Sequence, residues 1–193
     1  MIGPKKVSAS APIPIWQRVH ENAQGGFTLD KTGLVDGQLI PGGSPFGYNE
    51  ATRLARVIKQ ATMAQDAGAA DLDYYVKKDH NLAVGEIYSP AIGGKAYAIT
   101  AIDTSDPAKD KISFGTTLGA VLAGAVIFQS SATGATAGAF IVTPRGLLYA
   151  DVYVETNKEV TITIRGTVYE RRIPGTHGSI KAAIPNIIYS QSY

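Results

Sequence analysis

The chain has 193 residues, of which 45% are hydrophobic and 18% are charged, so it can bury a core of ordinary size and is not a disordered chain. Lys and Arg number 18 against 16 Asp and Glu, and a net charge of +2 gives no strong attraction to nucleic acid or to an anionic membrane. The absence of cysteine excludes disulfides, thiolate catalysis and cysteine zinc sites. The basic pairs Lys5-Lys6, Lys77-Lys78 and Arg171-Arg172 are scattered along the sequence, and we interpret them as solvated surface charge.

Residues 1–32 are predicted to form an extended N-terminal arm. Prolines in the segment Ala9–Trp16 remove backbone donors and favour extended conformations before them, so no helix is expected there. The segment also lacks the apolar core of a signal peptide. Ile13, Ile15 and Trp16 are unfavourable in water, and they are expected to dock on a surface. The sequence leaves two docking surfaces open, the chain's own domain and a partner subunit.

Residues 49–67 follow a Gly-rich turn region and can be interpreted in two ways. Leu54, Val57, Ile58 and Ala61 recur at helical spacing, and Asn49 could cap a helix, so the pattern favours a helix. A strand with long side chains on both faces is the alternative.

From Asp73 onward the sequence predicts short strands. Two are clear, Leu147–Val154 and Val160–Val168, because apolar and polar side chains alternate along each of them, which is typical of antiparallel sheets. With the turn residues Thr156–Lys158 between them, they are predicted to form a hairpin. The remaining strands are expected at Tyr74–Lys77, Ala83–Tyr88, Lys95–Ile102, Ile112–Thr116, Val121–Phe128 and Ala139–Thr143. This density of strands predicts a mainly β domain over residues 33–193, a small antiparallel sandwich or barrel.

The segment from Ile112 to Thr143 carries no charged residue and requires a membrane check. A spanning helix needs about 20 mainly apolar residues. Here the apolar run Leu118–Phe128 ends at a polar Gln-Ser-Ser sequence, and Gly, Thr and Ser interrupt the rest. Two short strands around a loop of small residues are therefore expected.

The C-terminal segment is predicted to contain a turn, a short helix and an extended tail. Pro174–Gly178 has turn composition, and Ser179–Ile184 fits one helical turn that Pro185 stops. The tail Asn186–Tyr193 is apolar and aromatic. A free end of this composition is expected to be pinned, either in its own sheet or against a neighbouring subunit.

The sequence holds no catalytic constellation. None of the three histidines has a second histidine at metal-ligand spacing. Asp103–Asp110 lacks the glutamate of a calcium loop, and Gly115–Gly119 lacks the lysine of a phosphate loop, so we interpret them as a solvated loop and a strand-to-turn junction. No Gly-x-Ser-x-Gly nucleophile elbow is present. We therefore expect no enzymatic activity, no cofactor and no metal ion.

Seven short segments, in their order along the chain, resemble phage head fiber proteins. They are Gly42–Arg53, Tyr75–His80, Val84–Glu86, Tyr97–Asp103, Gly115–Gly119, Arg165–Arg172 and Asn186–Tyr193. Their shared order carries the resemblance over most of the chain from Gly33 onward, whereas residues 1–32 have no counterpart. More remotely, the layout of strands and turns is similar to lambda-type head decoration proteins.

The resemblance implies a compact β domain of the decoration-protein type, with an extended N-terminal arm and C-terminal tail, in which residues 49–67 would be extended. It implies a structural virion protein, made in the host bacterial cytoplasm and bound to the outer capsid surface of a tailed phage. The implied partners are the major capsid protein and two further copies of the chain in a homotrimer, with no nucleic acid and no membrane.

The apolar chain ends are the candidate binding residues. Ile13, Ile15 and Trp16 are expected to contact the capsid, and Ile187, Tyr189 and Tyr193 are expected at the oligomer interface, because three-fold symmetry repeats every such contact. The alternative function is a fiber or tail module that binds a glycan or host receptor, in which exposed Tyr149 and Tyr153 would stack on sugars.

Overall fold

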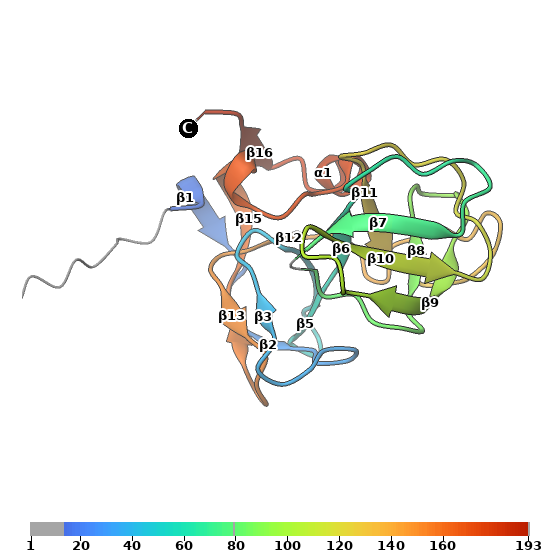
Figure 1. Ribbon diagram of the computed structural model, residues 1–193. Coiled ribbons are helices and arrows are strands. Elements are labelled where there is room, and N and C mark those ends of the chain that lie inside the picture. Colours follow the sequence, from blue (N-terminus) through green and yellow to red (C-terminus); the bar gives the residue numbers. More distant parts are fainter. Residues whose placement is uncertain (1–13, 79, 193) are drawn as a thin grey trace, which may run out of the picture.

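The computed structural model describes residues 14–78 and 80–192, which form a mainly β protein with 42% of residues in strands and 5% in helices. Most strands belong to a large sheet and a smaller one, on the left and right of Figure 1, and the hydrophobic core lies within and between them. The prediction of a mainly β fold with antiparallel sheets of sandwich or barrel form is confirmed.

The large sheet has eight strands in the order β1-β15-β12-β4-β5-β2-β14, with β16 also paired to β15. It curls around a cluster of buried side chains that includes Phe27, Phe46 and Ile162. The β2–β5 and β15–β16 pairs are parallel, and the others are antiparallel. The strands are β1 (Trp16–Asn22), β2 (Phe27–Leu29), β4 (Pro45–Asn49), β5 (Leu54–Val57), β12 (Gly146–Leu148), β14 (Glu159–Val160), β15 (Ile162–Tyr169) and β16 (Ile187–Ser190).

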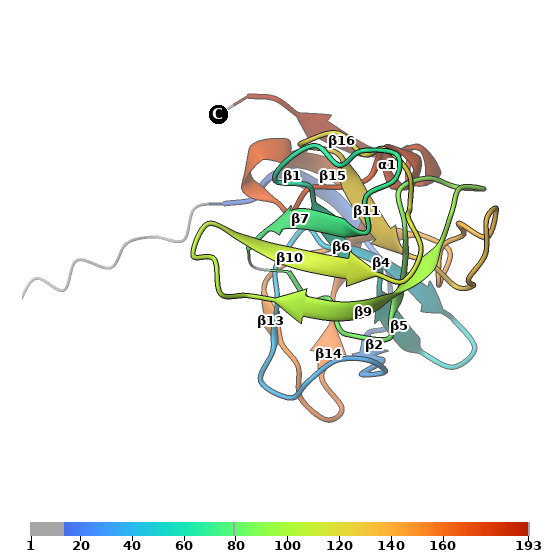
Figure 2. The same ribbon diagram turned by 45° about the vertical axis from the view of Figure 1, so that its right-hand side comes forward.

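The small sheet has six strands in the order β6-β11-β8-β9-β10-β7, and Figure 2 shows β7, β10 and β9 side by side. Met63, just after β6, bridges to Val76 of β7, and the Ala64 N–H donates to the Tyr75 carbonyl at 2.8 Å, so this sheet closes on itself. The strands are β6 (Gln60–Thr62), β7 (Asp73–Lys77), β8 (Ile87–Ser89), β9 (Tyr97–Asp103), β10 (Lys109–Phe114) and β11 (Val126–Gln129).

The remaining elements are short. β3 (Leu39–Ile40) pairs with β13 (Val152–Tyr153) in a two-stranded ribbon. The 3-10 helix η1 (Glu170–Arg172) follows β15, and α1 (Gly178–Ala183) precedes β16. Helix α1 and Pro185 confirm the predicted helical turn and its stop.

A third buried cluster joins the two sheets. It contains Phe128 from the small sheet, Leu147 and Val168 from the large sheet, and Ile180 from α1. Ile58, on the segment between β5 and β6, belongs to the same cluster. We call this set the middle cluster, because it gives the two sheets a shared core.

The helix that the sequence pattern predicted over residues 49–67 is wrong, because this segment contains the strands β5 and β6. Ala55 and Val57 are buried in the large sheet, Ile58 in the middle cluster and Ala61 in the small sheet. The chain changes sheets at Ile58, which interrupts the period of two and produces the apparent helical spacing. The Asn49 side-chain oxygen accepts from the Ala51 N–H at 2.9 Å and from the Thr52 N–H at 3.2 Å. It therefore stabilises a turn and does not cap a helix.

Other strand expectations differ in extent. β12 pairs with β15 as the predicted hairpin requires, with Leu147 opposite Thr163. The run Leu147–Val154 is nevertheless divided, because β13 leaves the large sheet to pair with β3. Ala139–Thr143 forms no strand, and Phe140 makes only an isolated bridge to Ser130. Among residues 14–78 and 80–192, none of the helices has the length and hydropathy that a membrane-spanning helix requires.

The segment expected as an arm over residues 1–32 contains two strands of the large sheet. β1 pairs with β15 along its length, and β2 pairs with β5 and β14. From residue 14 onward this segment is therefore part of the folded body.

Candidate interaction surface at the chain ends

The first and last strands flank the same central strand, β15. Trp16 of β1 lies opposite Val168, and Tyr189 of β16 lies opposite Val168 from the other side. Directly paired residues point to the same face of a sheet, so all three side chains face the middle cluster. Residues from opposite ends of the sequence thus meet in one row, and Figure 1 shows the three strands β1, β15 and β16 near the marked C-terminus.

Ile15 and Trp16 dock on the chain's own body. Trp16 is half-buried against the middle cluster, and its indole Nε1–H donates to the Tyr149 carbonyl at 2.7 Å. Ile15 packs so closely on Gly42 that a Cβ there would lie 2.7 Å from the Ile15 Cδ1. Of the two docking surfaces that the sequence left open, the structure places the Ile15 and Trp16 side chains on the chain's own domain. Ile13 lies outside the described residues.

The C-terminal candidates are also packed within the chain. Ile187 is buried in the middle cluster, and Tyr189 packs partly against it. The Tyr189 hydroxyl is buried and has no hydrogen-bond partner among the described residues. Its pKa is raised far above the ordinary value of 10.0, mainly by burial and further by the Glu170 carboxylate. Tyr193 lies outside the described residues.

The opposite face of these strands is open to solvent. Arg18, Thr167 and Ile188 form the adjacent row across β1, β15 and β16. Ile188 is 62% exposed, the largest apolar exposure on these three strands. Sequence reasoning missed Ile188, although the alternation of Ile187, Ile188 and Tyr189 in a strand would have placed it on the other face.

Both outer strands have an open edge. Among the described strands, β1 and β16 each pair only with β15. An unpaired edge presents backbone N–H and C=O groups that can pair with another chain. The terminal strands therefore combine two such edges with an exposed isoleucine.

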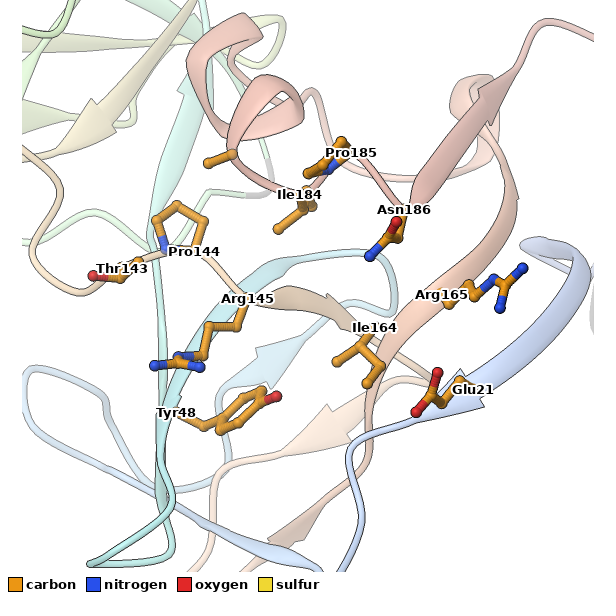
Figure 3. A pocket seen from close by; sticks show the side chains of 11 residues that line it. Glu21, Tyr48, Thr143, Pro144, Arg145, Ile164, Arg165, Ile184, Pro185 and Asn186 are labelled. Atoms are coloured by element: carbon orange, nitrogen blue, oxygen red, sulfur yellow. The ribbon is translucent and has the colours of Figure 1, made fainter.

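A hollow of about 400 Å3 lies beside these strands, between β15 and the α1–β16 connection (Figure 3). Its lining includes Glu21, Asn186 and Arg145, and the Arg145 guanidinium lies 5.2 Å from the centre of the Tyr48 ring. A second hollow of about 250 Å3 adjoins it and shares Glu21, Tyr48 and Ile164 with it. These side chains offer hydrogen-bonding groups of both charges around an aromatic ring.

His80, Asp110 and Lys78 form a cluster of titratable side chains within the fold. No group of three or more His, Cys, Asp or Glu side chains in residues 14–78 and 80–192 is placed to hold a metal ion. His80 Nε2 lies 3.0 Å from Asp110 Oδ2, although without hydrogen-bond geometry, and Lys78 contacts the other oxygen of Asp110 at 2.5 Å. Burial lowers the pKa of His80 below 6.5, and the attraction of Asp110 opposes this only in part.

Tyr149 and Tyr153 are exposed, by 44% and 57%. Tyr153 lies directly opposite Leu39 in the β3–β13 ribbon, and Leu39 is 40% exposed. This ribbon therefore presents an aromatic and an aliphatic side chain to solvent side by side.

Comparison with known proteins gives no relative for this chain: no family model, no curated protein and no solved structure matches it.

Proposed function

We propose that this chain is a non-enzymatic structural protein of a tailed-phage particle, which binds the outer surface of the capsid as a decoration or head fiber base protein and assembles as a homotrimer. The observation that carries the proposal is the meeting of both chain ends on β15, with Trp16 and Tyr189 opposite Val168. Contacts made through either terminal strand then come from one side of the molecule.

The described residues support a revised assignment of the contacts. Trp16 and Ile187 stabilise the fold of their own chain. The groups left for a partner subunit are therefore the free edge of β16 and the exposed Ile188. A strand added at this edge would form backbone hydrogen bonds and bury Ile188. Three-fold symmetry would repeat that contact three times, so modest burial per copy suffices.

The trimer is tested by measuring the mass of the purified full chain with light scattering. We expect three times the chain mass of 20.3 kDa. Ile188→Asp is expected to lower the mass to that of a monomer, because a carboxylate would have to be buried at the interface. Leu122→Asp is the matched control, since Leu122 is 70% exposed in the small-sheet region, and it should leave the trimer intact. A monomeric unaltered chain contradicts the proposal.

Capsid attachment is tested by co-sedimentation of the chain with phage capsids that lack it. A deletion that probes the N-terminus must stop before residue 14, because Pro14 and Ile15 already contact the folded body and β1 follows them. We expect the full chain to sediment with capsids in a fixed ratio. Failure of the folded, full-length protein to bind any capsid surface excludes the decoration role.

A second candidate function is a module that binds a host glycan, and the exposed Tyr149 and Tyr153 favour it. Aromatic rings in solvent can stack on sugar faces. Binding of the isolated protein to a glycan array, lost in Tyr153→Ala but kept in Leu122→Ala, would support this function over capsid attachment.

A further inference from the structure

Two basic pairs that are far apart in the sequence line one groove. A hollow of about 520 Å3 lies between the small sheet and η1, and its lining includes Lys77 and Lys78 at the end of β7 and Arg171 and Arg172 in η1. From the sequence, these pairs were expected to be scattered, solvated surface charge. The fold places them around one space.

The positive charge of this groove is only partly compensated. Lys78 is neutralised by Asp110 at 2.5 Å, whereas Lys77 is exposed and forms no ion pair with a described residue. Arg172 donates to the Pro14 carbonyl at 2.9 Å and stacks on Tyr169 at 4.3 Å. These two contacts hold the guanidinium in place without a carboxylate partner, so its positive charge remains available.

The acid at the groove is engaged elsewhere. Glu170 is the only carboxylate among the described lining residues, and its two oxygens contact the Lys181 amine and the Gln191 amide. Among the described lining residues, the charges of Lys77 and Arg172 are therefore left uncompensated, and these residues give the hollow a positive potential.

Gln60 adds a buried donor without a partner. Its Oε1 accepts from the His177 backbone N–H at 2.8 Å, which fixes the orientation of the amide. The Gln60 Nε2 is then buried at the groove with no hydrogen-bond partner among the described residues. Leaving such a donor unsatisfied destabilises the folded protein. An acceptor oxygen in the groove would satisfy this donor once the amide turns toward the hollow.

We propose that this groove binds a phosphate group. Phosphate carries about −1.5 to −2 charge at pH 7 and offers several strong acceptor oxygens, so it can use Lys77, Arg172 and the Gln60 amide together. A carboxylate carries one charge and would leave part of this set unused. The phosphate can belong to a soluble phosphomonoester or to a lipid headgroup. The site is independent of the capsid-binding function.

The test is a calorimetric titration of the full chain with glucose 6-phosphate at low ionic strength. Gln60→Glu keeps the acceptor for the His177 N–H and replaces the free donor by a negative oxygen, so we expect affinity to fall by about tenfold or more. Lys77→Gln, on an exposed side chain, should weaken binding several-fold. Arg18→Gln changes the net charge equally on exposed β1, outside the groove, and should leave affinity unchanged.

Two further measurements complete the test. Thermal melting of Gln60→Glu shows whether this variant is folded. If Gln60→Glu is unfolded, the change in affinity of Lys77→Gln decides whether the groove binds phosphate. Vesicles containing phosphatidic acid distinguish the source: retention that glucose 6-phosphate cannot compete points to a lipid headgroup, and competition points to a soluble phosphomonoester. The proposal is overturned if neither probe binds, or if Arg18→Gln weakens binding as much as Lys77→Gln.

Discussion

His177 joins three segments of the chain through one imidazole ring. Its Nδ1 accepts from the Ser179 N–H at 3.1 Å and so caps α1, its Nε2 lies 3.0 Å from the Pro90 carbonyl, and the ring meets Phe128 edge-on at 4.9 Å. Both hydrogen bonds form only when the ring is neutral with the proton on Nε2. Burial is the main cause that lowers the pKa of His177 below 6.5, and the Pro90 carbonyl opposes it.

Stability is therefore expected to fall as the pH drops through 6.5. The unfolded chain binds a proton at His177 near pH 6.5, whereas the folded chain resists it, so this stabilisation is complete above pH 6.5 and is lost toward the lower folded pKa. His80 acts in the same direction. His177→Asn keeps a cap acceptor and cannot be protonated, so urea unfolding between pH 7.5 and 5.5 should show a smaller loss of free energy than the unaltered chain. An equal loss in both proteins contradicts this role, and His20→Asn on exposed β1 is the control.

At the scale of the element, β1 is an edge strand that Trp16 fastens to the body. Its less exposed residues recur every third position, not every second, and its register against β15 shifts several times, so its backbone pairing is irregular. The indole packing and the hydrogen bond to Tyr149 compensate for this irregularity. Because the ring is only half-buried, the packing contribution is smaller than that of a fully buried tryptophan.

Trp16→Phe should lower the free energy of unfolding by about 1 kcal/mol, because it keeps an aromatic ring and removes the N–H donor. Trp16→Ala should lower it by about 3 kcal/mol, through the additional loss of buried area. Urea denaturation followed by circular dichroism measures both, with exposed Gln17→Ala as the control. Equal stability of the Phe and Ala variants would show that the ring does not contribute to docking.

At the scale of the whole molecule, Lys59 joins the two sheets by charge as the middle cluster joins them by apolar contact. Lys59 follows β5 of the large sheet, and its side chain is 2% exposed. Its amine donates to the Gly33 carbonyl and, at 2.5 Å, to Glu86, which precedes β8 of the small sheet. The second oxygen of Glu86 accepts from the Ala83 N–H and the Tyr88 hydroxyl, so both oxygens of this carboxylate are hydrogen-bonded.

Lys59→Met should lower the free energy of unfolding by about 3–5 kcal/mol, because it leaves the Glu86 carboxylate buried without a cation. Lys59→Met combined with Glu86→Gln should recover part of this loss, since no uncompensated charge remains. Denaturant unfolding of the two single variants and the double variant gives the coupling energy. Strictly additive losses would show that the two residues do not act as a pair.

The local character of the chain could be predicted well from the sequence. Period-two alternation identified most of the strand residues of Val160–Val168, although the run is divided between β14 and β15 and Thr163 of its polar face is buried. Turn composition located α1 and its stop at Pro185. These features depend on neighbours a few residues away, so the sequence carries them directly. The segment 49–67 was misinterpreted because its buried residues serve three different clusters, which no single period describes.

The sequence by itself determined that this is a mainly β protein with apolar chain ends and separate basic pairs. Only the tertiary structure decided which partners these groups meet: Trp16 and Tyr189 on either side of Val168, and Lys77 and Arg172 around one groove. The physical reason is that strand pairing and the curl of a sheet bring together residues distant in the chain. Such contacts leave no periodic trace in the sequence on either side of them.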